Sequence, residues 1–90
     1  MKVVWRHRAE LQLRAQLAYL KRVNLHAARR MAARIKQRVG RLKQFPRSGR
    51  PSGEPGVREL VISGTPYVAV YPIDDGAITI LRFFHMSQDR

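Results

Sequence analysis

The sequence predicts a small α+β domain with the order β-α-α-β-β-β, in which a helical hairpin packs on an antiparallel sheet. Three observations predict it. The length of 90 residues suits one domain, which we place over residues 1–90. Apolar residues recur at helical spacing in the first half of the chain and alternate with a period of two in the second half. A segment dense in glycine and proline, residues 45–56, separates the halves as a loop.

Two helices are predicted after a short opening strand. Residues 2–5 contain two valines and a tryptophan and are typical of a strand. Leu13, Leu17 and Leu20 then follow helical spacing, which predicts a helix over residues 7–23. Asn24 interrupts this pattern and is suited to cap a second helix. The second helix has a wide basic face behind an apolar stripe, which consists of Ala28, Met31, Ala32, Ile35, Val39 and Leu42.

Three strands are predicted after the loop, over residues 57–62, 67–73 and 77–84. Ser63-Gly64-Thr65-Pro66 separates the first two, and Asp75-Gly76 is a tight-hairpin signal before the third. Proline cannot donate to a sheet ladder, so we expect the middle strand to end at Pro72 or to lie at an edge. These strands should form an antiparallel meander with the helical hairpin on one face.

Charge is the strongest functional signal in the sequence. Eighteen Lys and Arg residues outnumber six Asp and Glu, which gives a net charge of +12, and fourteen of the eighteen are arginine. The planar guanidinium suits bidentate contacts with phosphate or carboxylate. Residues 11–53 contain twelve basic residues and no acidic one. Such segregation indicates a surface that binds a negatively charged macromolecule. The arginine codons favoured by a high-GC genome are an alternative explanation for part of the arginine content.

Composition argues against several kinds of site. The chain has no cysteine, and its three histidines are little material for zinc, so we expect no metal and no cofactor. The glycine-containing loop lacks Walker spacing and a following helix, which argues against nucleotide binding. We also expect no small-molecule substrate. No run approaches the roughly 20 apolar residues of a membrane span, and the N-terminus lacks the apolar stretch of a signal peptide. We therefore expect no membrane partner and a cytoplasmic location.

Five short motifs, taken in their order along the chain, resemble one known family. They are Asn24 with Ala27-Ala28-Arg29, Phe45-Pro46 leading to Gly49-Arg50-Pro51, Arg58-Glu59-Leu60-Val61, Pro66-Tyr67-Val68-Ala69-Val70-Tyr71, and residues 78–82 ahead of His85 and Gln88. Over nearly the whole chain they resemble the RelE/ParE superfamily of toxins from type II toxin–antitoxin systems. The resemblance is greater to the ParE side, whose members poison DNA gyrase, than to the RelE side, whose members cut mRNA on the ribosome. Two features depart from the ParE pattern. Pro72 stands where arginine is common, and His85 is followed by Met86-Ser87-Gln88-Asp89-Arg90 where the pattern usually has a glycine and a second basic residue.

The resemblance implies a ParE-like toxin that inhibits DNA gyrase and is neutralised by an acidic antitoxin, with operator DNA contacted only through that antitoxin. We expect the antitoxin to cover apolar surface as well as arginines, because charge alone is weakened by salt. Eight arginines are candidates for contact with the target or the antitoxin: Arg30, Arg34, Arg38, Arg41, Arg47, Arg50, Arg58 and Arg82.

The alternative is a RelE-like, ribosome-dependent mRNA endonuclease, whose catalytic residues would be Arg58, Arg82 and His85, with Glu59 nearby. Strand alternation places Arg58 on one face with Leu60 and Ile62. It likewise places Arg82 with Ile78, Ile80 and Phe84. No tyrosine follows Tyr71, so this set is incomplete, and a strand-end His85 bonded to the backbone is the favoured interpretation. We therefore predict no catalytic residue. A general nucleic-acid-binding domain and a degenerate toxin that keeps only antitoxin binding are further alternatives.

Overall fold

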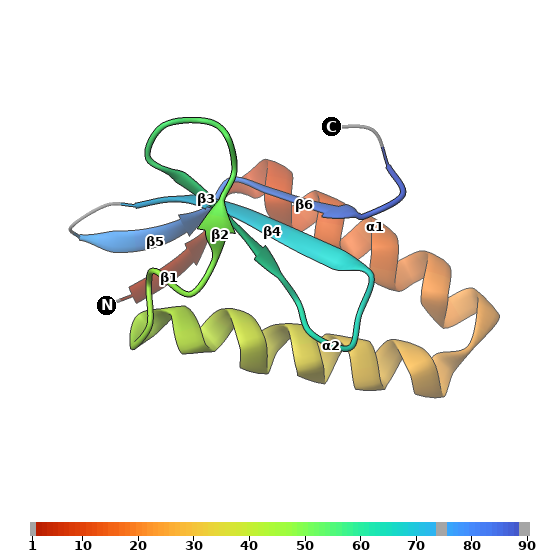
Figure 1. The fold of residues 1–90 in the computed structure, drawn as a ribbon. Helices are drawn as coiled ribbons and strands as arrows, with labels where there is room; N and C mark the ends of the chain where they lie inside the picture. The colour runs from red at the N-terminus through yellow and green to blue at the C-terminus, as the bar shows by residue number, and fades with distance from the viewer. Residues whose placement is uncertain (1, 74–75, 89–90) are drawn as a thin grey trace.

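A computed structural model describes residues 2–73 and 76–88 of the chain. It shows two helices packed on a mostly antiparallel sheet, which confirms the predicted α+β class (Figure 1). The elements are β1 (Lys2–Trp5), α1 (His7–Val23), α2 (Leu25–Gly40), the 3-10 helix η1 (Arg41–Lys43), β2 (Arg50–Pro51), β3 (Val57–Val61), β4 (Tyr67–Pro72), β5 (Ala77–Ile80) and β6 (Arg82–His85).

The helices form where their apolar residues recur. Ala9 of α1 and Ile35 and Val39 of α2 are buried in the main core, and Leu42 continues the α2 stripe on η1. The predicted cap is confirmed, because the Asn24 side chain accepts a hydrogen bond from the Ala27 amide at 3.0 Å. The two helices are therefore joined through Asn24 alone and fold back on one another.

The predicted meander is present, but the loop contains an extra strand. The larger sheet has the order β2-β3-β4-β6, and all its neighbours are antiparallel. β2 lies inside the segment predicted as a loop and adds two residues to the edge of β3. β4 ends at Pro72, as its missing amide donor predicts. Asp75 of the predicted Asp75-Gly76 turn lies outside the described residues.

The prediction of one last strand over residues 77–84 is wrong, because the strand is interrupted at Leu81. β5 pairs in parallel with β1, whereas β6 pairs with β4. The Leu81 amide donates to the Val70 carbonyl at 2.8 Å within this break. The extra residue reverses the alternation, so Ile80 and Phe83 both face the main core. Arg82 therefore does not share a face with Ile78 and Ile80, although it does share one with Phe84.

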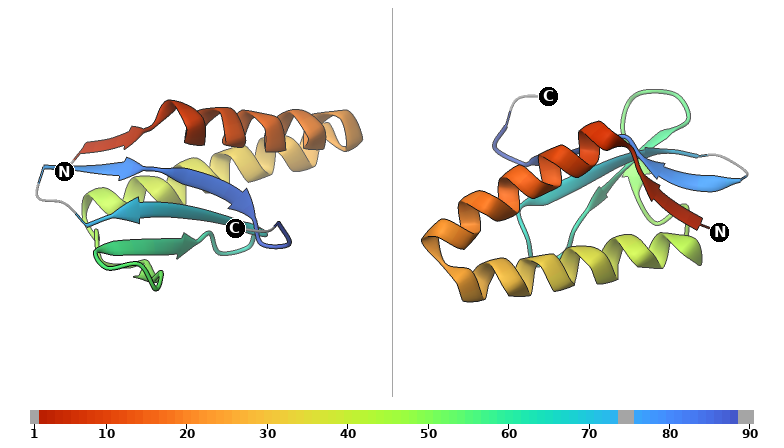
Figure 2. Two further views of the ribbon diagram at one scale, coloured as in Figure 1. Left: turned by 90° about the horizontal axis from the view of Figure 1, so that it is seen from above. Right: turned by 180° about the vertical axis from the view of Figure 1, so that it is seen from behind.

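The helical hairpin covers the sheet in two ways. α2 runs beneath one face, and α1 runs along the side of the sheet next to β6 (Figure 2). Tyr67, Ala69 and Tyr71 of β4 point into the main core on the α2 side. A second apolar cluster lies on the opposite face and is formed by Val57, Val61, Val68, Val70 and Phe84. The sheet thus has two buried faces, and a residue's register decides which of them it joins.

Two kinds of feature are absent from residues 2–73 and 76–88. None of their helices combines the length and apolarity needed to cross a membrane. Nor do their His, Asp and Glu side chains gather in threes as a metal ion would require.

Candidate functional site

A row of arginines follows α2 on the side next to the turn between β3 and β4. Arg30, Arg34 and Arg38 are spaced four residues apart and so share one face of the helix. Arg41 continues the row on η1. The Arg34 guanidinium lies against Gly64 of the turn, and Arg38 and Arg41 line a cavity of about 220 Å³ beside β3. We call these four residues the α2 arginine row.

Tyr71 attaches the loop after η1 to the sheet. Its hydroxyl donates a hydrogen bond to the Pro46 carbonyl at 2.7 Å and accepts one from the Gly49 amide at 2.9 Å. Arg58 Nη1 donates to the Gly49 carbonyl at 2.7 Å. Burial raises the pKa of the Tyr71 phenol, and the Gly49 hydrogen bond and the Arg58 charge act against that rise. This network holds the loop and the Arg58 guanidinium in fixed positions relative to β4.

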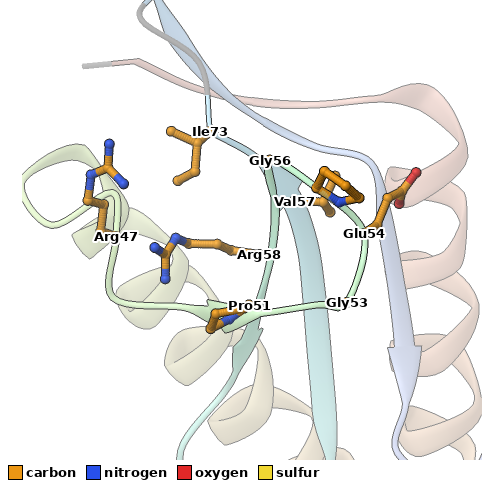
Figure 3. A pocket seen from close by; sticks show the side chains of 9 residues that line it. Arg47, Pro51, Gly53, Glu54, Gly56, Val57, Arg58 and Ile73 are labelled. Atoms are coloured by element: carbon orange, nitrogen blue, oxygen red, sulfur yellow. The ribbon is translucent and has the colours of Figure 1, made fainter.

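A pocket of about 570 Å³ opens between this loop and the β2–β3 connection. We call it the loop pocket; its walls include Arg47, Pro51, Pro55, Val57, Arg58 and Ile73. The side chains of Arg47 and Arg58 approach it from neighbouring parts of the chain, while the Glu54 carboxylate points away from both (Figure 3). The structure therefore brings together two of the predicted contact arginines, whose positions in the sequence are eleven residues apart.

Arg50 and Arg82 lie on the sheet face that points away from α2. The strand register places Arg50 opposite Glu59, Glu59 opposite Val70, and Val70 opposite Arg82. Residues directly opposite one another share a face, so these four side chains form one row across the sheet. Glu59 is only 5% exposed, and its Oε1 lies 3.3 Å from Arg50 Nε. Arg50 is thus held partly by an internal ion pair.

The candidate nuclease residues do not converge on one place. Arg58 lies opposite Tyr71 and Arg82 opposite Val70, and neighbouring strand residues point to opposite faces. His85 lies opposite Tyr67, at the other end of β4, and meets its ring edge-on with 5.7 Å between centroids. Its Nδ1 accepts a hydrogen bond from the Ser87 amide at 3.1 Å, which agrees with the strand-end interpretation.

Sequence reasoning missed an apolar groove of about 450 Å³ between α1, α2 and β1. We call it the hairpin groove; its walls include Trp5, Leu13, Leu17, Lys36, Val39 and Lys43. Ala32 and Gly40 also line it. Ala32 and Gly40 were the signal in the sequence that could have predicted this groove, because small side chains on this side of α2 leave space that larger ones would fill.

Comparisons with known proteins show the family to which the chain belongs. Residues 3–90 match the family described as ParE toxin of type II toxin-antitoxin system, parDE. The chain belongs to the ParE toxin family. It is 37% identical over 86 residues to Toxin RelE2 of Caulobacter vibrioides, with 96% of each chain covered. A solved chain described as the chromosomal ParDE TA system from P. aeruginosa matches with a TM-score of 0.83 and 28% identity, over 94% of this chain and 95% of that one.

Membership of this family confirms the predicted resemblance. It makes the chain a type II toxin of the ParE/RelE kind and implies an antitoxin partner.

Proposed function

We propose that this ParE-family toxin inhibits DNA gyrase in the cytoplasm and does not cut RNA. The observation that carries the proposal is the separation of Arg58 from Arg82 across the sheet. RNA cleavage needs acid–base groups and a cation positioned around one phosphate. Arg58 already donates to the Gly49 carbonyl, and His85 lies at the far end of β4. An inhibitor that acts by binding needs no such convergence.

The basic surface of the toxin supports the proposal of a target that is bound to a polyanion. The α2 arginine row and the two loop-pocket arginines give six positive side chains on α2, η1, the following loop and β3. Gyrase works on DNA, whose phosphates attract such a surface over long distances. We assign target contact mainly to these six residues, and a smaller part to Arg50, because Glu59 offsets its charge.

The acidic antitoxin is proposed to dock in the hairpin groove. The groove is lined by the apolar side chains of Leu13, Leu17 and Val39. Lys36 and Lys43 add positive charge to the same groove. An amphipathic helix with acidic residues beside its apolar stripe fits this combination. Such contacts also retain affinity in salt, because apolar burial is not screened.

The gyrase proposal is tested with purified toxin and gyrase in a supercoiling assay and a cleavage-complex assay. We expect inhibition by the toxin and a weaker effect with the double variant Arg30→Gln/Arg34→Gln. The charge-matched control is Lys21→Gln/Arg29→Gln, which removes two exposed charges outside the α2 arginine row. Undiminished supercoiling at a large excess of toxin contradicts the proposal.

The endonuclease remains the second candidate, because a relative that covers almost the whole chain is named Toxin RelE2. A cell-free translation reaction tests it directly. Codon-specific mRNA cleavage that Arg82→Ala abolishes would establish the RelE-like activity and reject the gyrase proposal. We expect intact mRNA.

A further inference from the structure

The loop pocket combines two arginines with apolar walls, and the charge-based contact proposed for gyrase uses only the arginines. It is formed where the loop after η1 meets the β2–β3 connection and the end of β4. Its volume of about 570 Å³ lies in the range of sites for small groups. Specific sites of this size combine mostly apolar walls with a few convergent polar groups. The loop pocket has that composition, with aliphatic and proline walls and two guanidinium groups.

Arg58 is held in place before any ligand arrives. Its backbone is paired in β3, opposite Tyr71, and its Nη1 donates to the Gly49 carbonyl at 2.7 Å. A guanidinium has five N–H donors in a fixed plane, so one such bond orients the group and leaves further donors. The side chain is half-buried, which means that little rotamer freedom is lost when a ligand binds.

Arg47 supplies a second positive charge from the opposite loop. It is exposed, and Figure 3 shows its guanidinium on the same side of the pocket as that of Arg58. Glu54 lines the far end and points away from both arginines (Figure 3). The two guanidinium groups therefore favour an anionic group between them.

The residues that line the pocket favour a carboxylate carried by a peptide over a nucleotide. Val57 and Ile73 are aliphatic, and Pro51 and Pro55 add further apolar surface. Single-stranded nucleic acid is held by aromatic rings on which bases stack, and no aromatic residue lines this pocket in the described part of the chain. An aliphatic side chain beside a carboxylate would use both features of the pocket.

We propose that the loop pocket binds one carboxylate side chain together with a neighbouring aliphatic side chain from an acidic protein segment. The carboxylate lies between Arg47 and Arg58, and the aliphatic group packs on Ile73. That the segment belongs to the antitoxin rests on the proposed function, whereas the preference of the pocket for this chemistry does not. The site is separate from the hairpin groove, so an antitoxin would hold the toxin at two places.

The test titrates full-length toxin, isotope-labelled for NMR, with four probes. They are acetyl-Glu-Leu-amide, acetyl-Gln-Leu-amide, acetyl-Glu-Gly-amide and inorganic phosphate. We expect saturable shifts of the Arg58 side-chain N–H and the Ile73 methyl signals with the Glu-Leu probe. The Gln-Leu and Glu-Gly probes should bind more weakly, because each lacks one of the two groups. Phosphate should leave the Ile73 methyl unmoved.

Matched variants locate the effect. Arg47→Gln should weaken the Glu-Leu probe roughly threefold to tenfold, as expected for a partly exposed charged contact. Arg29→Gln removes the same charge from an exposed position of α2 and should leave binding unchanged. Equal binding of the Glu-Leu and Gln-Leu probes, equal effects of the two variants, or tighter binding of phosphate would each overturn the proposal. The titration contains neither gyrase nor antitoxin, so its outcome is independent of the gyrase assay.

Discussion

The Tyr71 hydroxyl accepts a hydrogen bond from the Gly49 amide at 2.9 Å, and so joins β4 to a loop 22 residues earlier in the chain. The same hydroxyl donates to the Pro46 carbonyl at 2.7 Å. One phenol oxygen thus satisfies two backbone groups of a loop that has little regular structure of its own. The position of this loop, and of one wall of the loop pocket, depends on that oxygen.

Replacing Tyr71 with phenylalanine should therefore destabilise the protein. The ring still fills its place in the core, but the Gly49 amide loses its acceptor and the Pro46 carbonyl loses its donor. We expect a loss of about 1–3 kcal/mol in the free energy of unfolding, measured by urea denaturation. Tyr19→Phe is the control, because Tyr19 is 65% exposed and its change should stay within about 0.5 kcal/mol. Equal effects of the two variants would contradict this role for Tyr71.

Stability should also fall at alkaline pH. Burial raises the pKa of both Tyr67 and Tyr71, so each phenol stays neutral to higher pH in the folded state than in the unfolded state. Their contribution is therefore complete below the unfolded pKa, near pH 10, and is lost as the pH rises through the folded value. We expect the free energy of unfolding to decrease above about pH 10. The double variant Tyr67→Phe/Tyr71→Phe should show a smaller decrease, and an unchanged slope would contradict the assignment.

The elements that sequence predicted correctly depend on local signals. Asn24 ends one helix and caps the next within a few residues, and Pro72 ends β4 through its missing amide. The parallel pairing of β1 with β5 joins residues more than seventy positions apart, and nothing within either strand indicates it. The break at Leu81 was missed for a similar reason. The run 77–84 is continuously β-like, and only the competing partners β1 and β4 divide it.

The candidate site shows the same limit. The wide basic face predicted for the second helix depends on helical geometry, which is local, and the spacing of four places Arg30, Arg34 and Arg38 on one side of α2. Whether Arg58 and Arg82 share a sheet face depends on register across β3, β4 and β6, and one inserted residue changes the answer. The loop pocket likewise requires tertiary contacts, since Arg47 and Arg58 meet only after Tyr71 holds the loop.

Replacing Gly49 and Gly40 with alanine should change the free energy of unfolding in opposite directions. A Cβ at Gly49 would lie 2.6 Å from the Tyr71 hydroxyl oxygen and 2.9 Å from the Glu59 carbonyl oxygen, so the loop must move. Gly49→Ala should cost about 1–3 kcal/mol, as overpacking does. Gly40 has helical backbone angles and nothing within 4 Å of its Cβ position, so Gly40→Ala should stabilise by about 0.4–1 kcal/mol. Thermal denaturation of both variants checks the signs, and two shifts of one sign would refute the argument.

The junction between the helices should depend on the Asn24 side chain. Its Oδ1 accepts a hydrogen bond of 3.0 Å from the Ala27 amide, which would otherwise be an unpaired donor in the first turn of α2. Asn24→Ala should lower the free energy of unfolding by about 0.5–2 kcal/mol. Asn24→Asp keeps an acceptor and places a negative charge at a helix N-terminus, so it should retain most of the stability. Equal losses in the two variants, measured by urea denaturation, would show that capping is not the cause.

The free edge of β6 is protected by side chains of α1 and the C-terminal turn. The Phe83 amide donates to Gln12 Oε1 at 2.9 Å, and the His85 amide donates to Gln88 Oε1 at the same distance. Exposed strand edges invite pairing with other chains, so the two glutamine side chains that accept from these amides have a protective role. Gln12→Ala should speed hydrogen exchange at the Phe83 amide and cost about 0.5–1.5 kcal/mol in unfolding free energy. Gln37→Ala, an exposed change on α2, serves as the control. Unaltered exchange at Phe83 would mean that packing of α1 against β6, rather than the amide bond, shields this edge.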